Sequence, residues 1–366
     1  MDRTDLDGLL RRLAEADGSD LHLKAGSPPR IRVNGDLVRL GDEPVVQAPD
    51  LETVAKEIMH ERIWAGFEET YEADFAYGIH DLGRFRVNAF RQRGSVGLVF
   101  RLVRPSARTF EALNLPPAVQ RLADEQRGLV LVTGPTGSGK TTTLAAMIDH
   151  INHTRECHVV TIEDPIEVLH RDDVAAISQR EVGFDTKSFL VALRAALRED
   201  PDVILVGEMR DPETVATALS AAETGHLVFS TLHTVDAVET INRIVDFFPA
   251  NQQRQARISL AGALKGTICQ RLVQTADGSG RVPALEIMIV NGRIQQTIID
   301  PARGTDIMQV IREGEYYGMQ TFDQSLVELV ESGVIDLRAA AQASSNPHDL
   351  RVALQQRGLM PAAAAR

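Results

Sequence analysis

The sequence is poor in cysteine and in long apolar runs, and each scarcity excludes a class of protein. The two cysteines, Cys157 and Cys269, lie far apart and match no disulfide framework or zinc-ligand spacing. No apolar run approaches the ~20 residues that a membrane-spanning helix requires. The first 20 residues are rich in aspartate and arginine and lack the apolar segment of a signal peptide. We therefore expect a cytoplasmic protein.

Positive charge and aromatic residues are also scarce. Asp and Glu number 51 against 39 Lys and Arg, a formal net charge of −12, and aromatic residues make up 5% of the chain. Proteins that bind the phosphate backbone of nucleic acids usually carry the opposite balance. We therefore expect no direct nucleic-acid partner. Hydrophobic residues reach 43% of 366, which allows a sizeable core and about two or three domains.

A complete phosphate-binding loop follows the apolar run 129–132 and precedes a predicted helix over 142–151. Its glycines let backbone N–H groups face a polyphosphate, and the helix N-terminus adds partial positive charge. Lys140 can reach the β- and γ-phosphates, and the Thr141 hydroxyl can bind magnesium. The sequence therefore predicts ATP and magnesium as cofactors. The predicted nucleotide-binding residues are Gly134, Pro135, Thr136, Gly137, Ser138, Gly139, Lys140, Thr141 and Thr142.

An N-terminal domain over residues 1–104 is predicted to be a small α+β domain with an antiparallel sheet. Asn34-Gly35 between two short apolar runs is a hairpin signal. Alternating patterns predict strands over 85–90 and 97–101, and a helix is expected over 54–63. Residues 105–116, which begin and end with proline, are predicted to be a linker with a hinge near Pro105.

The remaining residues, 117–366, alternate between predicted strands and helices. This alternation is typical of a parallel sheet covered on both faces, which binds ligands at the carboxyl ends of its strands. From about Ser259 onward the chain is predicted to be mostly helical. The expected strands are 129–132, 158–162, 203–206 and 227–230, and the expected helices include 187–198, 212–222 and 237–245.

Acidic residues follow two of these strands. Glu163 directly follows 158–162, and Glu208 follows 203–206, with Asp211 close behind. A carboxylate at that edge can hold magnesium or orient and deprotonate an attacking water, whereas an isolated one more often caps a helix. His226 and His233 bracket the strand 227–230, and either one alone is typically a hydrogen-bonded structural residue.

Arginines crowd the last two N-terminal strands. Most of such a set usually belongs to a solvated strand face. The alternative is that some reach a nucleotide held by a neighbouring subunit, as arginine fingers do. The arginines are Arg84, Arg86, Arg91, Arg93 and Arg101.

Taken together, these motifs resemble the secretion ATPase superfamily and, within it, the PilT-like ATPases of type IV pilus retraction. Residues 134–141 resemble its Walker A loop and 161–167 its aspartate box. Residues 202–211 resemble its atypical Walker B motif and 224–234 its histidine box. Segments 20–23, 31–35 and 83–90 are similar to its PAS-like N-terminal domain. The resemblance implies a RecA-like P-loop ATPase domain preceded by a small PAS-like domain.

The same resemblance implies roles for individual residues. Thr141 and Glu208 would position magnesium, and Glu163 would be the general base. His226 and His233 would sense the γ-phosphate or the neighbouring subunit, and Arg84, Arg86 or Arg101 would close over the phosphates. The expected assembly is a homohexamer at the cytoplasmic face of the inner membrane. It would associate with the membrane only through a pilus platform protein.

Several alternatives remain open. The segment 292–299 matches the retraction-type signature poorly, and 270–273 is closer to assembly relatives, which keeps pilus assembly or type II secretion as an alternative. A DNA-directed RecA-like motor and a nucleotide-gated regulatory module are the other two classes. The acidic net charge argues against the first, and the carboxylates Glu163 and Glu208 argue against the second.

Overall fold

The computed structural model describes residues 1–33, 35–103, 107–301 and 306–360. The chain divides into two compact units. The first consists of Met1–Ser106 with Pro165–His170, and the second of Ala107–Asp164 with Arg171–Arg366. The predicted boundaries had placed Pro165–His170 in the second domain. The predicted hinge at Pro105 lies outside the described residues.

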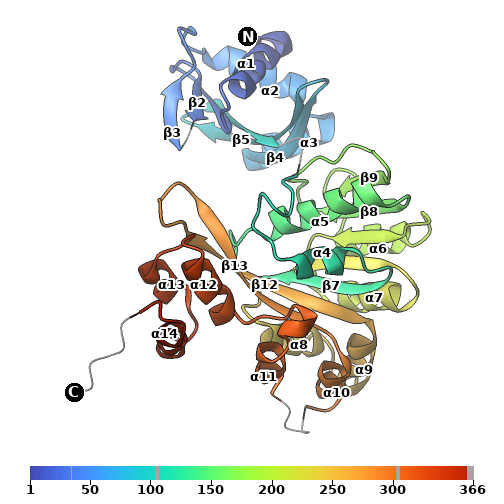
Figure 1. Cartoon of the computed structure of the whole chain (residues 1–366). Helices are drawn as coiled ribbons and strands as arrows, with labels where there is room; N and C mark the ends of the chain where they lie inside the picture. Colours follow the sequence, from blue (N-terminus) through green and yellow to red (C-terminus); the bar gives the residue numbers. More distant parts are fainter. Residues whose placement is uncertain (34, 104–106, 302–305, 361–366) are drawn as a thin grey trace. The chain divides into compact units, whose positions relative to one another are not determined.

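The first unit is an antiparallel sheet with helices packed on one face (Figure 1). Within the described residues its strand order is β3-β2-β1-β6-β5-β4. Its core combines Leu6, Leu10 and Phe67 from the helices with Phe85 and Phe100 from the strands, all fully buried. The elements are α1 (Arg3–Glu15), β1 (Asp20–Lys24), β2 (Arg30–Val33), β3 (Asp36–Arg39), α2 (Ala48–Ile58), α3 (Glu61–Thr70), β4 (Glu72–Ile79), β5 (Gly83–Gln92) and β6 (Ser95–Val103).

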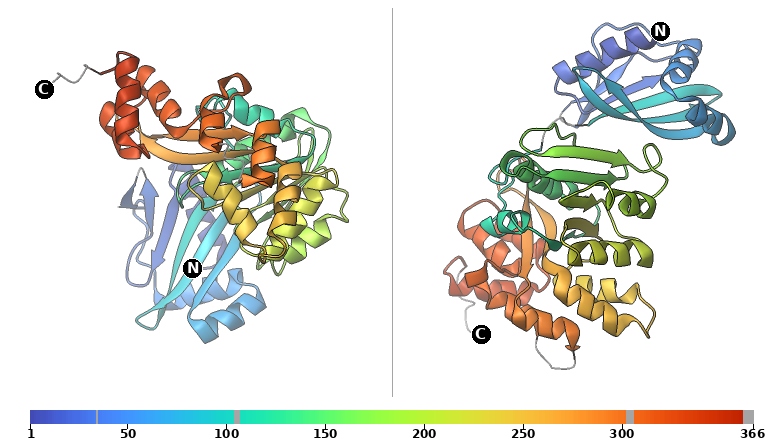
Figure 2. Two further views of the ribbon diagram at one scale, coloured as in Figure 1. Left: turned by 90° about the horizontal axis from the view of Figure 1, so that it is seen from below. Right: turned by 90° about the vertical axis from the view of Figure 1, so that its right-hand side faces the viewer.

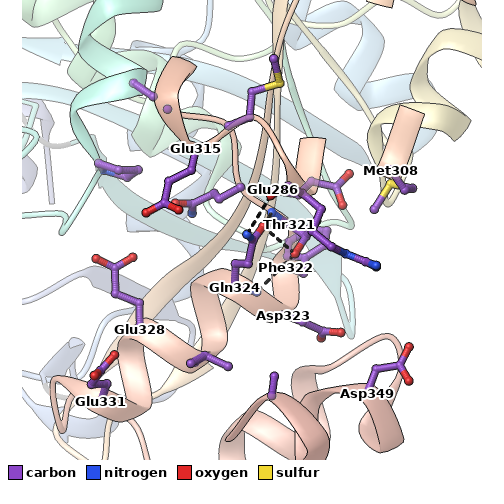
Figure 3. A pocket seen from close by; sticks show the side chains of 18 of the residues that line it. Glu286, Met308, Glu315, Thr321, Phe322, Asp323, Gln324, Glu328, Glu331 and Asp349 are labelled. Carbon is purple, nitrogen blue, oxygen red and sulfur yellow. Dashed lines mark hydrogen bonds between the residues drawn. The ribbon is translucent and has the colours of Figure 1, made fainter. Parts of the chain in front are cut away.

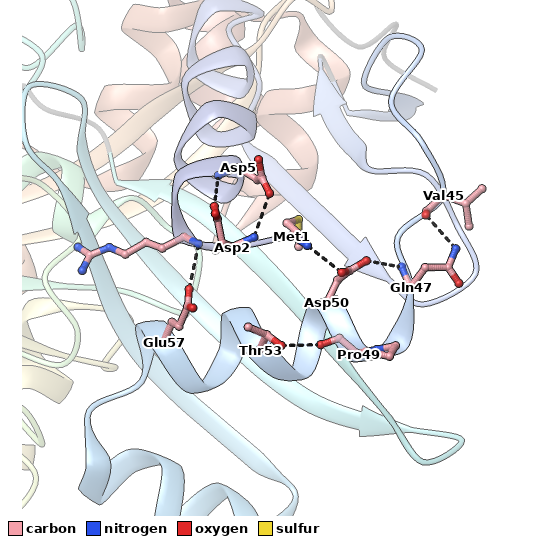
Figure 4. Close-up of polar contacts among 10 residues, drawn as sticks. Met1, Asp2, Asp5, Val45, Gln47, Pro49, Asp50, Thr53 and Glu57 are labelled. Carbon is pink, nitrogen blue, oxygen red and sulfur yellow. Dashed lines mark hydrogen bonds and ion pairs between the residues drawn. The ribbon is translucent and has the colours of Figure 1, made fainter.

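Polar contacts hold the start of α1 against α2 (Figure 4). Asp2 caps α1 by accepting a hydrogen bond from the backbone N–H of Asp5 at 3.0 Å. The amino group of Met1 lies 2.7 Å from the Asp50 carboxylate, and the backbone N–H of Arg3 donates to Glu57 at 3.0 Å. The bonds from Asp5 and Arg3 satisfy N–H groups that the first turn of a helix leaves without intrahelical partners.

The single helix predicted over 54–63 is wrong, because the chain breaks between α2 and α3. Met59 adopts an extended conformation after Ile58. His60 is also extended, and its ring accepts a hydrogen bond from the backbone N–H of Arg62, so that it caps a new helix. The apolar spacing continues across the break, which is why the pattern suggested one helix.

The second unit is a mostly parallel sheet with helices on both faces, as predicted (Figures 1 and 2). In the part of the chain that is described, the strand order is β13-β12-β7-β11-β10-β8-β9, and β13 is antiparallel to β12. Leu129 and Leu131 of β7 pack into the core on one face, and Val130 and Val132 pack into the core on the other. The strands are β7 (Gly128–Thr133), β8 (His158–Glu163), β9 (Ala176–Glu181), β10 (Val203–Val206), β11 (Leu227–Leu232), β12 (Leu264–Gln274) and β13 (Arg281–Ile289).

The helices of the second unit fall into two groups around this sheet. Helices α4 and α5 share one core with the sheet, and α6 to α9 share the other. The bounds are α4 (Pro117–Ala123), α5 (Lys140–Thr154), α6 (Phe189–Ala196), α7 (Pro212–Glu223), α8 (Ala237–Asp246), α9 (Gln253–Ala263), α10 (Gly292–Ile299), α11 (Ile307–Arg312), η2 (Glu315–Tyr317), α12 (Phe322–Glu331), α13 (Leu337–Ala343) and α14 (Pro347–Gln356). Among the described residues, no helix is long and apolar enough to cross a membrane.

The expectation of a mostly helical chain from about Ser259 is wrong for residues 264–289. This segment forms the long strands β12 and β13, which pair with each other and extend the sheet beyond β7. Both strands are buried on both faces, so they lack the polar–apolar alternation of a half-exposed strand. The chain becomes helical after Ile289.

Candidate nucleotide-binding and catalytic site

The phosphate loop occupies the turn from the end of β7 into α5, and Lys140 is the first residue of that helix. Gly134, Gly137 and Gly139 have φ values of 141°, 78° and 89°, a region that other residues rarely adopt. The ammonium group of Lys140 donates to the carbonyl oxygens of Gly134 and Pro135 at 2.8 and 3.1 Å. Lys140 is therefore held over the loop, where it can exchange these acceptors for phosphate oxygens.

The other predicted nucleotide-binding side chains differ in their exposure. Pro135, Thr136 and Thr142 are exposed, whereas Ser138 is buried. Thr141 is half-buried and lies in the first turn of α5, next to Lys140. Its position suits a hydroxyl that contacts a metal held between the helix and the phosphates.

Glu163 and Glu208 lie at the same edge of the sheet as the phosphate loop. Glu163 ends β8, and Glu208 follows β10, which pairs in parallel with β8. Glu163 is buried, and its Oε1 accepts hydrogen bonds from the Thr161 hydroxyl at 2.7 Å and from the Gln179 amide at 3.1 Å. Two hydrogen-bond donors therefore fix the orientation of this carboxylate.

Glu208 belongs to a cluster of charged side chains. Its carboxylate forms an ion pair with Arg210 and lies 3.6 Å from Nε2 of His233. Burial lowers the pKa of His233, and the positive charges of Lys140 and Arg210 lower it further. Lys140, Glu208, Arg210 and His233 therefore share one electrostatic environment, in which His233 favours its neutral form.

His226 lies at the other end of β11. It directly precedes the strand, and its backbone carbonyl accepts a hydrogen bond from Gly128, the first residue of β7. Its ring contacts the carbonyl oxygen of Ala221 at 3.0 Å. Because β7 and β11 run in parallel, His226 and the phosphate loop occupy opposite edges of the sheet. The structure thus brings His233, but not His226, to the phosphate loop of its own chain.

Asp211 has a structural role, as is usual for an isolated acidic residue near a helix start. Its carboxylate caps α7 by accepting from the backbone N–H of Thr214 at 2.8 Å and from the Thr214 hydroxyl at 2.6 Å. Such caps typically contribute about 1 kcal/mol to stability. With both oxygens engaged in the cap, Asp211 is a poor candidate for a catalytic residue.

The arginines singled out on β5 and β6 differ in their surroundings. Arg84 and Arg86 alternate with the buried Phe85 and Val87 on β5 and so point away from the core, and Arg101 of β6 lies opposite Arg86 in the register of the two strands. Arg91, in contrast, makes two hydrogen bonds to Glu52 at 2.9 and 3.2 Å.

Arg101 also has an intramolecular partner. Its Nε lies 2.8 Å from the buried carboxylate of Asp20. Burial alone would raise the pKa of Asp20, but the hydrogen bonds from Ser19 and Arg101 outweigh it and hold the pKa below its usual value. Arg101 therefore stabilises this carboxylate, and a contact with phosphate would compete with that ion pair.

Two residues near the site were not predicted from the sequence. Arg210 contacts Glu208, and its place two residues after that carboxylate was the available signal. Gln270, from β12, donates to the backbone carbonyl of Ser138 in the phosphate loop at 2.6 Å. It is 132 residues away from Ser138 in the sequence, so no local pattern identifies the contact.

A separate groove of about 1000 Å³ lies among the C-terminal helices of the second unit (Figure 3). Its described lining includes Thr321, Phe322 and Glu286, but neither the phosphate loop nor Glu163 or Glu208. Glu286 is 1% exposed, and burial raises its pKa to about 7 even though the backbone N–H of Ala237 donates to its carboxylate at 2.9 Å.

This raised pKa predicts a pH-dependent stability. The folded protein holds a proton on Glu286 up to about pH 7, whereas the unfolded chain releases it near pH 4.5. The free energy of unfolding should therefore fall by about 3 kcal/mol as the pH rises through this window. Glu286→Gln keeps an acceptor for Ala237 and should remove this contribution. Urea unfolding measures the free energy of unfolding of both proteins at pH 5 and pH 8. Relative to the wild type, the variant should be more stable at pH 8 than at pH 5, and an equal stability difference at both pH values would contradict the assignment.

The fold, together with the edge of the sheet that carries the phosphate loop, defines the class of the protein. A parallel sheet with a phosphate loop after β7, and carboxylates after the neighbouring strands β8 and β10, is the architecture of a RecA-like P-loop ATPase. The family model for "Type II/IV secretion system protein" matches residues 78–344, and this protein belongs to that family. The predicted membership of the secretion ATPases is confirmed.

Two curated relatives and one solved structure show how close the similarity is. The chain is 46% identical to the type IV pilus retraction ATPase PilT of Pseudomonas aeruginosa, over 94% of this chain and 99% of that protein. It is also 46% identical to a twitching motility protein of Neisseria gonorrhoeae, over 88% of this chain and 86% of that protein. A crystal structure of the pilus retraction motor PilT with bound ADP is 47% identical, has a TM-score of 0.87, and covers 96% of this chain and 99% of its own. The predicted PilT-like character is therefore confirmed.

Proposed function

We propose that this protein is a hexameric motor that hydrolyses ATP to drive retraction of type IV pili. The observation that carries the proposal is the nearly full-length similarity to retraction ATPases, in both sequence and fold. The complete phosphate loop and the two carboxylates at its edge of the sheet supply the chemistry that hydrolysis requires.

In this proposal, Lys140 and the N–H groups of the phosphate loop hold the phosphates of ATP. Magnesium fits the oxygen ligands that this site offers, because it binds through one or two protein oxygens together with substrate phosphates. In this proposal, the Thr141 hydroxyl and the Glu208 carboxylate are these protein oxygens. When bound, magnesium would offset the negative charge on the phosphates.

Glu163 orients the attacking water and accepts its proton. Its fixed carboxylate, held by Thr161 and Gln179, suits a group that must keep one orientation toward water. In this proposal His233 responds to the γ-phosphate, which its nearness to Glu208 and to the charge of Lys140 supports. His226, at the opposite edge of the sheet, is a candidate only for contact with a neighbouring subunit.

The proposed assembly is a homohexamer at the cytoplasmic face of the inner membrane. Domain movements during hydrolysis would be transmitted to a platform protein of the pilus machinery, through which the motor associates with the membrane. Arg84, Arg86 or Arg101 would complete the site from the first unit of the same chain or of its neighbour. No direct contact with nucleic acid is part of the proposal.

Deletion of the gene in its native host, beside a Lys140→Ala allele, tests the function. Lys140→Ala removes the charge that binds the phosphates, so both strains should carry excess surface pili and lose twitching. Pili are counted by electron microscopy, with wild type and a complemented deletion as controls. Bald cells in both strains would instead indicate an assembly motor. Unchanged pili would contradict a role in this machinery.

A further inference from the structure

Gln270 is a buried polar side chain that joins two parts of the nucleotide site. It is 1% exposed. Its amide nitrogen donates to the backbone carbonyl of Ser138 at 2.6 Å, and its amide oxygen accepts from the Thr143 hydroxyl at 2.9 Å. Ser138 lies in the phosphate loop, and Thr143 lies in α5, the helix that the loop begins. One side chain from β12 therefore bridges both halves of the phosphate-binding element.

The phosphate loop lies directly against Gln270, with no spare room. A Cβ atom at Gly134 would lie 2.4 Å from the backbone oxygen of Gln270, and one at Gly139 would lie 2.9 Å from its amide nitrogen. These glycines thus allow close contact with β12, in addition to the turn of the loop. The pairing of Cys269 with Thr133 places Gln270 beside the start of the loop.

The same hairpin also contacts a second loop of the site. Glu286 of β13, opposite Cys269 in the register, accepts from the backbone N–H of Ala237 at 2.9 Å. Ala237 follows the segment that carries His233. The β12–β13 hairpin is in turn bound to the C-terminal helices, since Arg271 donates to the carbonyl of Ala343 at 2.7 Å. The hairpin therefore connects these helices with two loops of the nucleotide site.

We propose that Gln270 is a positioning residue that fixes the phosphate loop in the conformation that binds nucleotide. The inference rests on the proposed binding of ATP at this loop. An amide side chain suits the role, because its N–H group can donate to the carbonyl of Ser138 while its oxygen accepts from the hydroxyl of Thr143. Methionine, with similar length but without either polar atom, cannot make these bonds.

The test compares Gln270→Met, Thr143→Val and the double variant with wild type in the assembled protein. Affinity for a fluorescent ADP analogue, the KM for ATP and kcat are measured together with the melting temperature. Gln270→Met should weaken ADP binding about tenfold or more, and Thr143→Val about threefold, because a lost intramolecular hydrogen bond shifts an equilibrium by such factors. The KM should rise more than kcat falls.

The double variant tests whether the two residues act together. Once Gln270 is methionine, Thr143→Val should cost little additional ADP affinity, because its hydrogen-bond acceptor is already gone. Thr267→Val is the matched control. It removes a buried hydroxyl from the same strand, and among the described residues that hydroxyl makes no hydrogen bond to either loop. Its ADP affinity should equal that of wild type.

Three results would overturn the inference. Gln270→Met with a lower melting temperature but unchanged ADP affinity would make Gln270 a stabilising core residue only. If Gln270→Met does not fold, unchanged ADP affinity in Thr143→Val would have the same meaning. Failure of the wild type itself to bind ADP would overturn the proposed function, and this inference with it.

Discussion

Glu208→Gln is expected to lower the rate of ATP hydrolysis about 10²-fold or more while ATP binding is retained. The substitution keeps the size of the side chain but removes the negative charge that would attract magnesium and that pairs with Arg210. Phosphate release at saturating ATP measures the rate, and binding of a fluorescent ATP analogue measures affinity. Undiminished hydrolysis would remove Glu208 from the catalytic roles.

Two further variants separate the metal role from the base role. Glu163→Gln should also lose turnover, but its dependence on magnesium concentration should match that of wild type, whereas Glu208→Gln should need more magnesium. Glu213→Gln is the matched control, because Glu213 is exposed on α7 and pairs with Arg194. Its turnover should be normal. A shifted magnesium dependence in Glu163→Gln alone would reverse the two assignments.

The parts of the fold that could be predicted are those whose signals are local. The phosphate loop is a contiguous motif, and β7, β10 and β11 are short apolar runs bounded by turn residues. The strand β12 was missed for a physical reason. Gln270 interrupts its apolar run, and its polar atoms are satisfied by Ser138 and Thr143, more than a hundred residues earlier. A sequence pattern contains no information about such partners.

The candidate site shows the same difference between local sequence signals and contacts between distant residues. Glu163 and Glu208 could be found because parallel strands place their carboxyl ends at one edge. The same rule, applied to a residue that precedes a strand, would have assigned His226 to the opposite edge. In contrast, the ion pair between Arg101 and Asp20 joins residues 81 apart in the sequence, and only the register of β1 with β6 reveals it.

Arg84→Ala is expected to lower hydrolysis in the assembled ring by a factor approaching the about 10³–10⁵ that arginine fingers supply elsewhere. Arg84 is half-buried on β5 and points away from the core of its own unit, so the melting temperature of the variant is measured beside the rate to separate a loss of fold from a loss of catalysis. Arg91→Ala is the control on the same strand, because Arg91 is bound to Glu52. Its hydrolysis rate should stay near that of wild type. An unchanged rate in Arg84→Ala would show that Arg84 has no catalytic role and would support its interpretation as part of a solvated strand face.

Mixed rings then determine which subunit supplies the arginine. Arg84→Ala subunits keep an intact phosphate loop, and Lys140→Ala subunits keep an intact Arg84. If Arg84 acts on the nucleotide of a neighbouring subunit, mixing the two inactive proteins before assembly should restore hydrolysis at the interfaces where an intact arginine meets an intact loop. If Arg84 closes over the nucleotide of its own chain, no such interface exists and the mixture should stay inactive. Restored hydrolysis would therefore establish a ring whose catalytic sites are shared between subunits, because neither parent protein could supply both groups.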